Sequence, residues 1–266
     1  MNALTESNVP GLESTSTFYD KLSIDYDTMT GFEKRFVHER PFFNMLLERY
    51  SIRTALDAGA GTGFHSLLMA ELGVEMTAID VSKKMLERVK EHAKVRHLKI
   101  DIAQSSFEDL PDRVHRKFDA VLCMGNSLPH LSTKGDVEHS LKNFATVLHS
   151  GGILFLQILN YNRILANRER VQSVKELGGV TFVRFYEFHS DHVIFNILKL
   201  KKENGQPLQE LESVRLRPIL KEELVRVLFE AGFSEVHTHG SIMLDDFHEK
   251  SSKDLVVLAR KPLAKS

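Results

Sequence analysis

The feature that most constrains this chain is a glycine-rich segment, Asp57-Ala58-Gly59-Ala60-Gly61-Thr62-Gly63-Phe64. A short apolar run precedes it, and the apolar spacing of residues 64–70 is typical of a helix. A strand, a glycine loop and a helix in this order open a nucleotide-binding α/β sheet. Glycines let the loop turn tightly and approach a ligand, which a Cβ would prevent. Loops of this kind also occur for structural reasons alone, so the segment by itself leaves two interpretations open.

The spacing of the glycines separates two classes of cofactor. A dinucleotide fingerprint spaces its glycines GxGxxG, and its last glycine allows close helix–strand packing. Counting from Gly59 and Gly61, that position is Phe64, which argues against a nicotinamide oxidoreductase. A second expected strand, residues 74–80, ends in Asp80, and a carboxylate at this offset accepts hydrogen bonds from ribose hydroxyls. Ser82 follows as the expected N-cap of a helix.

These motifs resemble those of the class I S-adenosylmethionine-dependent methyltransferases. The string Gly125-Asn126-Ser127-Leu128-Pro129-His130-Leu131 is similar to the corresponding motif of the glycine and sarcosine N-methyltransferases. The resemblance implies S-adenosyl-L-methionine as cofactor and a Rossmann-like α/β fold with a seven-stranded, mostly parallel sheet. The residues that it assigns to cofactor binding are Asp57, Gly59, Ala60, Gly61, Gly63, Asp80, Val81, Ser106, Phe107, Met124, Gly125 and Asn126.

One pair of these residues only partly fits the family pattern. At Ser106 the family usually has an acidic residue that contacts the adenine amino group, and at Phe107 a small or aromatic residue. Phe107 fits the aromatic variant. Ser106 departs from the acidic one, so its hydroxyl or a water would have to replace the carboxylate. An ordinary loop serine is the alternative interpretation.

Three residues are candidates for the catalytic site: Tyr26, Asn126 and His130. Residues 18–29 resemble the N-terminal segment of many small-molecule methyltransferases, which forms a helical lid and brings its second tyrosine, here Tyr26, to the reacting end. Alternatively, Phe18, Leu22 and Tyr26 form the buried stripe of one helix. Asn126 offers a donor and an acceptor to a neutral amine. His130 is either a general base, because the unperturbed histidine pKa lies near neutrality, or a structural histidine.

The sequence says less about the methyl acceptor than about the cofactor. In glycine N-methyltransferases an arginine before an Asn-Tyr pair holds the substrate carboxylate, whereas here Leu159 precedes Asn160-Tyr161. Glycine itself is therefore in doubt as acceptor, and Arg163 or Arg168 are the possible replacements.

An antiparallel insert is expected after the fifth strand. From residue 178 the apolar period changes to two, which predicts strands over 180–186, 192–198 and 211–218, with Ser190-Asp191 in the first turn and Asn204-Gly205 in the second connection. The candidates to face a substrate from this insert are Thr181, Arg184, Tyr186 and Arg215.

The expected organisation is an N-terminal arm and lid helices over residues 1–50 and a methyltransferase domain over 51–262, which includes the substrate-covering insert at 178–218. Residues 1–17 are polar, and we expect them to be mobile. Helices are expected over 36–47, 83–89, 137–148 and 221–231. Further strands are expected over 97–100, 118–124, 153–159, 233–238 and 255–259, the last two of them antiparallel, with a turn at 149–152.

The composition of the chain argues against several kinds of partner. The net charge is −1, which argues against a nucleic-acid partner. The chain has one cysteine, no secretory signal and no apolar run that could cross a bilayer, so we expect a cytoplasmic protein without a membrane partner. The histidines of residues 237–248 are expected to be solvated rather than to bind a metal.

The function predicted from the sequence is in-line methyl transfer from S-adenosylmethionine to a small molecule, with an amine nitrogen as the expected acceptor atom. Such a reaction depends mainly on alignment of its reactants. The alternatives are an RNA or protein methyltransferase and a non-catalytic protein that binds S-adenosylmethionine.

Overall fold

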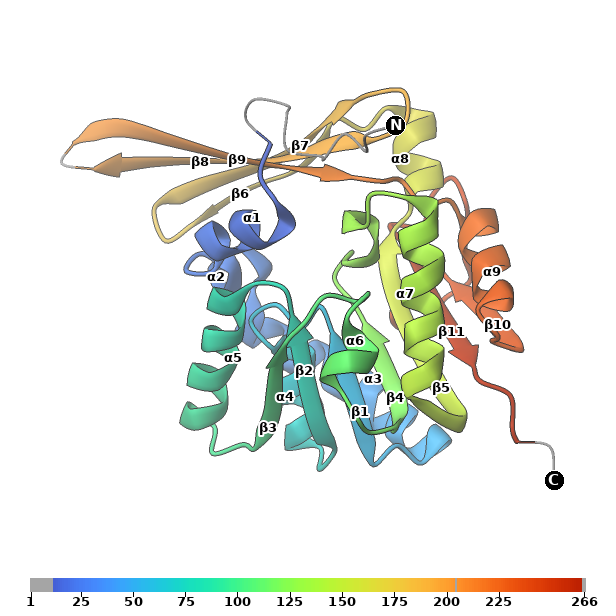
Figure 1. Cartoon of the computed structure of the whole chain (residues 1–266). Coiled ribbons are helices and arrows are strands. Elements are labelled where there is room, and N and C mark those ends of the chain that lie inside the picture. The colour runs from blue at the N-terminus through green and yellow to red at the C-terminus, as the bar shows by residue number, and fades with distance from the viewer. Residues whose placement is uncertain (1–11, 204, 265–266) are drawn as a thin grey trace.

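The structure is a computed structural model that describes residues 12–203 and 205–264, and within them the chain forms one seven-stranded and one four-stranded sheet (Figure 1). The larger sheet has the order β10-β11-β5-β4-β1-β2-β3. Its strands are β1 (Thr54–Ala58), β2 (Glu75–Asp80), β3 (Ile100–Gln104), β4 (Phe118–Cys123), β5 (Leu148–Leu159), β10 (Glu235–His239) and β11 (Asp254–Arg260). β11 runs antiparallel to both neighbours, whereas the pairs from β5 to β3 are parallel. The predicted seven-stranded, mostly parallel sheet is confirmed.

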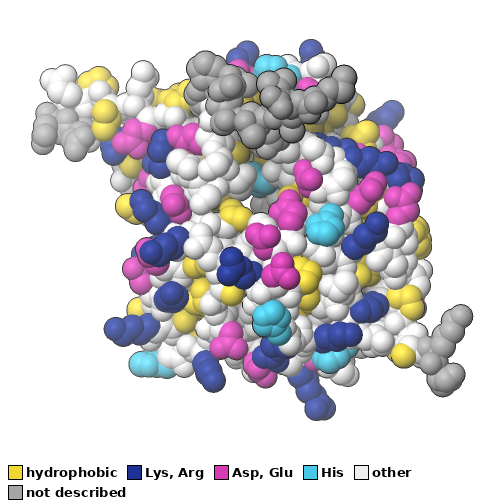
Figure 2. Space-filling view, in the orientation of Figure 1, with side chains coloured by type: hydrophobic (Ala, Val, Ile, Leu, Met, Phe, Trp, Pro, Cys, Tyr) yellow, Lys and Arg dark blue, Asp and Glu magenta, His cyan; other side chains and the backbone are white. Residues whose placement is uncertain are grey.

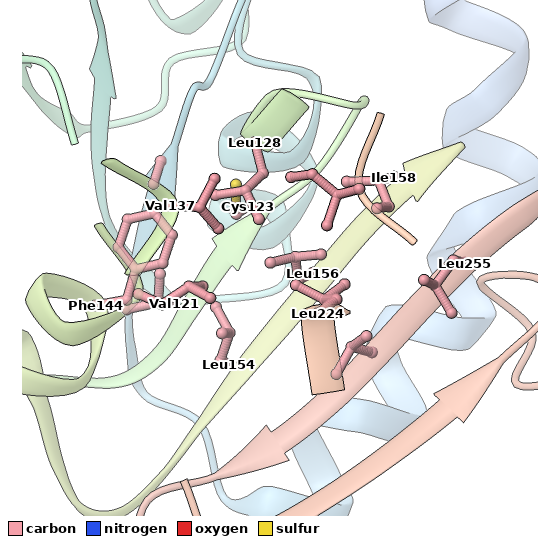
Figure 3. Packing of buried hydrophobic residues seen from close by; sticks show 14 of the residues in the cluster. Val121, Cys123, Leu128, Val137, Phe144, Leu154, Leu156, Ile158, Leu224 and Leu255 are labelled. Carbon is pink, nitrogen blue, oxygen red and sulfur yellow. The ribbon is translucent and has the colours of Figure 1, made fainter. Parts of the chain in front are cut away.

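Helices cover both faces of this sheet. On one face lie α3 (Phe32–Tyr50), α4 (Phe64–Glu71) and α5 (Lys83–Val95), and on the other α6 (Leu110–Arg113), α7 (Lys134–Val147) and α9 (Lys221–Glu230). Successive side chains of a strand point to opposite faces, so a strand covered on both sides is apolar throughout. In β4, Val121 and Cys123 pack with α7, and Leu122 belongs to the core under α3 and α4 (Figure 3).

The ends of the helices follow local chemistry. Ser82 caps α5 by accepting a hydrogen bond from the Met85 amide, as predicted. Thr133 and Asp136 form a capping box at the start of α7. Gly232, with φ +99°, follows the end of α9.

The smaller sheet is antiparallel and lies beyond the carboxyl ends of the parallel strands (Figure 1). It follows α8 (Tyr161–Asn167) and consists of β6 (Val171–Leu177), β7 (Val180–Phe188), β8 (Val193–Glu203) and β9 (Gln206–Leu216). The insert predicted after the fifth strand is confirmed, but it has four strands rather than three. β6 escaped prediction because it is an edge strand whose side chains are mostly polar and exposed. The turn at Ser190-Asp191 is confirmed, and Asn204 lies outside the described residues.

Two short helices, α1 (Thr15–Leu22) and α2 (Tyr26–Thr30), lie between the two sheets (Figure 1). Phe18 and Leu22 are buried, but α1 ends at Leu22 and Tyr26 begins a separate helix. The interpretation of Phe18, Leu22 and Tyr26 as the stripe of one helix is therefore wrong. Residues 15–17, expected to be mobile, form the first turn of α1, whereas residues 1–11 of the predicted arm lie outside the described residues.

Several strand boundaries differ from expectation, among them those of β3, β5, β8, β9 and β10. The third strand begins at Ile100 because His97 adopts φ +55° and turns the chain after α5. The expected turn at 149–152 is an irregularity within β5, where the pairing with β4 passes from Phe118–Leu148 to Ala120–Ile153. In the described part of the chain, no helix is both long and apolar enough to cross a membrane.

Candidate active site

A cavity of about 360 Å³ opens at the carboxyl ends of β1, β2 and β4. This is the crevice in which open α/β sheets bind their ligands. Many of the predicted cofactor residues line it, namely Gly59, Ala60, Gly61, Asp80, Val81, Ser106, Phe107, Met124 and Gly125.

The three glycines of the loop have positive φ and different surroundings. A Cβ on Gly59 would lie 2.7 Å from the Ser127 Oγ, and one on Gly63 would lie 3.0 Å from both Val89 methyl carbons. A Cβ on Gly61 would have the Tyr26 Cε1, at 3.7 Å, as its nearest neighbour. The loop therefore packs closely at Gly59 and Gly63, and Gly61 leaves its backbone open to the cavity.

The two acidic residues of the motifs are placed differently. Asp57 is buried and accepts hydrogen bonds from the Ser66 amide (3.0 Å) and hydroxyl (2.6 Å), which joins β1 to α4. Burial raises the pKa of Asp57, and the residue is not among the described residues that line the cavity. Asp80 lines the cavity and accepts hydrogen bonds from the Gly61 and Ser82 amides, each at 2.8 Å. Burial raises the pKa of Asp80 to about 6.

Ser106 and Phe107 form another wall of the cavity. The Ser106 hydroxyl donates to the Asp109 carboxylate (3.0 Å) and accepts from the Asp109 amide (3.1 Å). Asn143 holds the same loop by donating to the Phe107 and Glu108 carbonyl oxygens, each at 3.0 Å. The Ser106 hydroxyl is thus engaged within the protein, and its contact with adenine stays a prediction.

A second cavity, of about 280 Å³, adjoins the first and is bounded by α1, α2, the ends of β4 and β5, and β6 to β9. The two cavities have a common wall, made of Tyr19, Tyr26, Thr30, Arg35, Gly125 and His130. Tyr26 and His130, two of the predicted catalytic residues, belong to this wall and therefore border both cavities.

Asn126 lies in the second cavity, and its amide is already in use. Its Nδ2 donates to the Tyr161 hydroxyl and its Oδ1 accepts from the Leu159 amide, both at 3.0 Å. These bonds hold the residue at φ +67°. The second N–H of the Asn126 side chain takes part in neither bond.

His130 shares a hydrogen bond of 2.9 Å between its Nε2 and the Tyr19 hydroxyl. Its Nδ1 is buried and has no hydrogen-bond partner among the described residues. Burial lowers the pKa of His130 to about 4. The imidazole is therefore neutral at physiological pH and too weakly basic to hold a proton taken from an ammonium group.

Arg35 was missed by the sequence analysis. It lies in the first turn of α3 and lines both cavities. Its Nε donates to the Glu39 carboxylate at 2.7 Å, and its guanidinium carbon lies 3.8 Å from the centre of the Phe64 ring. Only the packing of α3 against α4 brings it to the glycine loop, so no local motif could have identified it.

The candidates for acceptor binding divide according to strand face. Arg184 and Tyr186 line the second cavity, and so does Leu159. Thr181 is three residues from Arg184 on β7, so its side chain lies on the opposite face of the sheet. Arg215 forms an ion pair with Asp191 (3.1 Å) and is not among the described residues that line the second cavity.

The predicted replacements for the missing arginine are not placed to act. Arg163 forms an ion pair with Glu169 (3.1 Å), and Arg168 lies over the Phe188 ring. Neither is among the described residues that line the second cavity. In the same part of the chain no three His, Cys, Asp or Glu side chains are grouped as a metal site requires, and the expected absence of a metal stays a prediction.

Comparison with known proteins agrees with this geometry. Residues 55–152 match a family described as a methyltransferase domain. The chain is 28% identical to the glycine/sarcosine N-methyltransferase of Aphanothece halophytica over 236 residues, which cover 89% of this chain and 86% of the relative. It is 38% identical to the glycine N-methyltransferase of Oryctolagus cuniculus over 134 residues, 46% of this chain and 45% of the relative.

The solved structures show the same fold. An S-adenosylmethionine-dependent methyltransferase from Clostridium acetobutylicum superposes with a TM-score of 0.79 at 17% identity, covering 92% of this chain and 99% of the other. A sugar N-methyltransferase from Streptoalloteichus superposes with a TM-score of 0.61 at 18% identity, covering 98% of this chain and 99% of the other.

Proposed function

Because this chain is a class I S-adenosylmethionine-dependent methyltransferase, we propose that it methylates an amine nitrogen of a small molecule. The observation that supports this function is the pair of adjoining cavities with a common wall. One cavity has the glycine loop and Asp80, and the other, of about 280 Å³, is near the lower end of the range for small-molecule sites.

The residues of the first cavity fit the cofactor. Asp80 would accept hydrogen bonds from the ribose hydroxyls, and the open backbone at Gly61 would allow the methionine portion to approach. Arg35 lies at the common wall and would pair with the methionine carboxylate. Phe107 would lie against the adenine ring, and it is close to Gly59, where a Cβ would approach the Phe107 ring to 3.3 Å. Asp57 and Gly63 act indirectly, because they hold the loop to α4 and α5.

S-adenosylmethionine held in the first cavity would supply a methyl group that is electrophilic because it is attached to a sulfonium sulfur. The lone pair of the acceptor amine would form the new N–C bond as the C–S bond breaks, the C–S electron pair would stay on sulfur, and the methylated nitrogen would lose a proton to solvent. The protein contributes alignment, which is worth several kcal/mol in such reactions. Tyr26 borders the transfer path, Asn126 orients the amine, and the buried wall favours its neutral form. His130 positions Tyr19 and is not the base.

The alternatives lack comparable support. On the face seen in Figure 2, Lys and Arg side chains are interspersed with Asp and Glu, without the broad basic surface that an RNA substrate requires. A non-catalytic binder of S-adenosylmethionine would have no need for a second cavity that shares lining residues with the first.

The test is a methyl-transfer assay with S-adenosylmethionine and a panel of small primary and secondary amines. We expect S-adenosylhomocysteine and a methylated amine in equal amounts, detected by mass spectrometry. Asp80→Ala is expected to abolish both at micromolar cofactor. Tight binding of S-adenosylhomocysteine without methylation of any amine would overturn the proposal in favour of a non-catalytic binder.

A further inference from the structure

The inner face of the four-stranded sheet carries basic residues that are unusual for a partly buried surface. Phe182, Arg184 and Tyr186 alternate along β7 on one face, and Phe182 and Tyr186 are buried in the main core. The pairing register places Lys175 of β6 opposite Phe182, and Lys199 of β8 opposite the same residue from the other side. Three cations therefore share the face that looks toward α1 and α2.

These cations are not neutralised equally. Lys199 is buried and pairs with Asp25 (2.9 Å) and Glu210 (3.2 Å). Arg184 donates its Nε to the Ser173 hydroxyl at 2.7 Å and forms no ion pair with any carboxylate in residues 12–203 and 205–264. The ionisable groups that affect the pKa of Arg184 most are the hydroxyls of Tyr26 and Tyr186.

The electrostatics of the cavity agree with an excess of positive charge. Burial lowers the pKa of the Arg184 guanidinium. Lys175, which lines the same cavity, has a pKa lowered by burial and by the nearby charge of Arg184. Partly buried charges are normally paired, so an uncompensated cation facing a cavity indicates a site for an anion.

Two further polar atoms of the second cavity are buried without a hydrogen-bond partner among the described residues: the Tyr186 hydroxyl and the Gln172 Oε1. The Tyr186 side chain is 1% exposed. Gln172 is the extra residue of a bulge, because Val171 and Ser173 pair with the adjacent residues Phe185 and Arg184. An unsatisfied buried polar group costs ~1–3 kcal/mol, and such groups need a partner.

We propose that the methyl acceptor is an anionic amine, and that Arg184, supported by Lys175, binds its carboxylate or other anionic group. This inference rests on the proposed function. The Tyr186 hydroxyl donates to the same anion, and the Gln172 Oε1 accepts a hydrogen bond from an N–H or O–H group of the acceptor. The anion site is thus on the inserted sheet rather than at the end of β5, where Leu159 supplies no charge.

The test compares amines that differ only in charge. The probes are ω-amino acids from glycine to 6-aminohexanoate, the corresponding carboxamides, and aminoalkylphosphonates of the same lengths. The quantity measured is kcat/KM for methylated product. We expect at least one carboxylate or phosphonate to be preferred over its amide by ~10–100-fold, the range of a charge-assisted hydrogen bond. The carboxylate and phosphonate series distinguish the two kinds of anion.

The variant Arg184→Gln is expected to raise KM for the preferred acid by ~10–100-fold and to leave that of its amide unchanged. Arg184→Lys should restore part of the preference. Arg215→Gln, on the outer face of the same sheet, is the matched control and should change neither. Calorimetric titration with S-adenosylhomocysteine shows that each variant is folded, because the affinity should stay that of the wild type.

Two results overturn the inference in different ways. Methylation of amides as efficiently as of acids, or an acid preference that survives in Arg184→Gln, excludes the anion site and leaves the proposed function intact. Absence of methylation of every probe, with S-adenosylhomocysteine bound normally, overturns the proposed function together with it.

Discussion

If Asp80 binds the cofactor as proposed, binding is predicted to depend on pH through this one buried carboxylate. Burial raises its pKa to about 6, and protonation removes the negative charge that makes the carboxylate a strong hydrogen-bond acceptor. The affinity for S-adenosylhomocysteine should therefore be constant above about pH 7 and fall ~10-fold per pH unit below about pH 6. Asp80→Asn should bind ~10–100-fold more weakly near neutrality, with a flat profile. Asp101→Asn, at an exposed position of β3, is the control, and calorimetry between about pH 5 and pH 8 measures all three proteins.

A comparison of Gly59 with Gly73 distinguishes the effect of backbone strain from that of steric contact. Both Gly59 (φ +78°) and Gly73 (φ +88°) have left-handed backbone, but an added Cβ meets Ser127 at 2.7 Å in the first case and nothing within 4 Å in the second. Either alanine variant should lose ~1–2 kcal/mol of unfolding free energy from its backbone. Only Gly59→Ala should lose more than this and also lose cofactor affinity. Urea unfolding and calorimetry test this, and equal losses in the two variants would contradict it.

The residues that the sequence identified share one property. Gly59, Gly61 and Asp80 lie within short motifs whose chemistry is local, a strand end followed by a turn. Arg35 and Gln172 reach the site by other means, Arg35 through the packing of a distant helix and Gln172 through a bulge. Neither packing nor a bulge leaves a periodic signal, so these residues could be found only in the structure.

At the scale of elements, the N-terminal helices are tied to both sheets. Asp20 on α1 accepts hydrogen bonds from the Ser82 hydroxyl (2.5 Å) and the Lys84 amide (3.2 Å) at the start of α5. On the other side, Asp25 pairs with Lys199 of β8. The helices thus bridge the cofactor cavity and the inserted sheet, which supports their proposed role as a lid.

Lys199→Met should loosen this bridge. Asp25 and Glu210 are about one third exposed, so water would solvate them after the change and the loss of stability should be ~1 kcal/mol or less. The local effect should be larger, because the link between α2 and the inserted sheet is gone. Amide hydrogen exchange should become faster in residues 15–30 while the parallel sheet is unaffected. Lys202→Met, at an exposed position of the same strand, should leave exchange unchanged.

Some helices and strands could be predicted from the sequence and others could not, for a physical reason. Strands covered on both faces, such as β4, are apolar throughout and were identified directly. β6 is a partly exposed edge strand, and its pairing with β7 depends on the neighbouring hairpin rather than on its own composition. The break between α1 and α2 was missed because Phe18, Leu22 and Tyr26 have helical spacing across a point where the helix ends.

At the scale of the whole molecule, ligand binding should be coupled to stability and to the N-terminal helices. A ligand at about 100 times its Kd stabilises the native state by ~2.7 kcal/mol, which in a chain of this size raises Tm by roughly 5–10 °C. S-adenosylhomocysteine should produce this shift. NADH should not, because Phe64 occupies the position of the third glycine of a dinucleotide loop.

The same ligand should slow hydrogen exchange in two separate segments. The first cavity is lined both by the glycine loop and by Thr15, Tyr19, Tyr26 and Thr30 of α1 and α2, so a ligand there restrains both. Protection limited to the glycine loop, with α1 and α2 exchanging as in the free protein, would contradict the lid. Protection of both segments that is lost for α1 and α2 alone in Lys199→Met would show that the inserted sheet holds the lid in its closed position, and would link the acceptor cavity to cofactor binding through one ion pair.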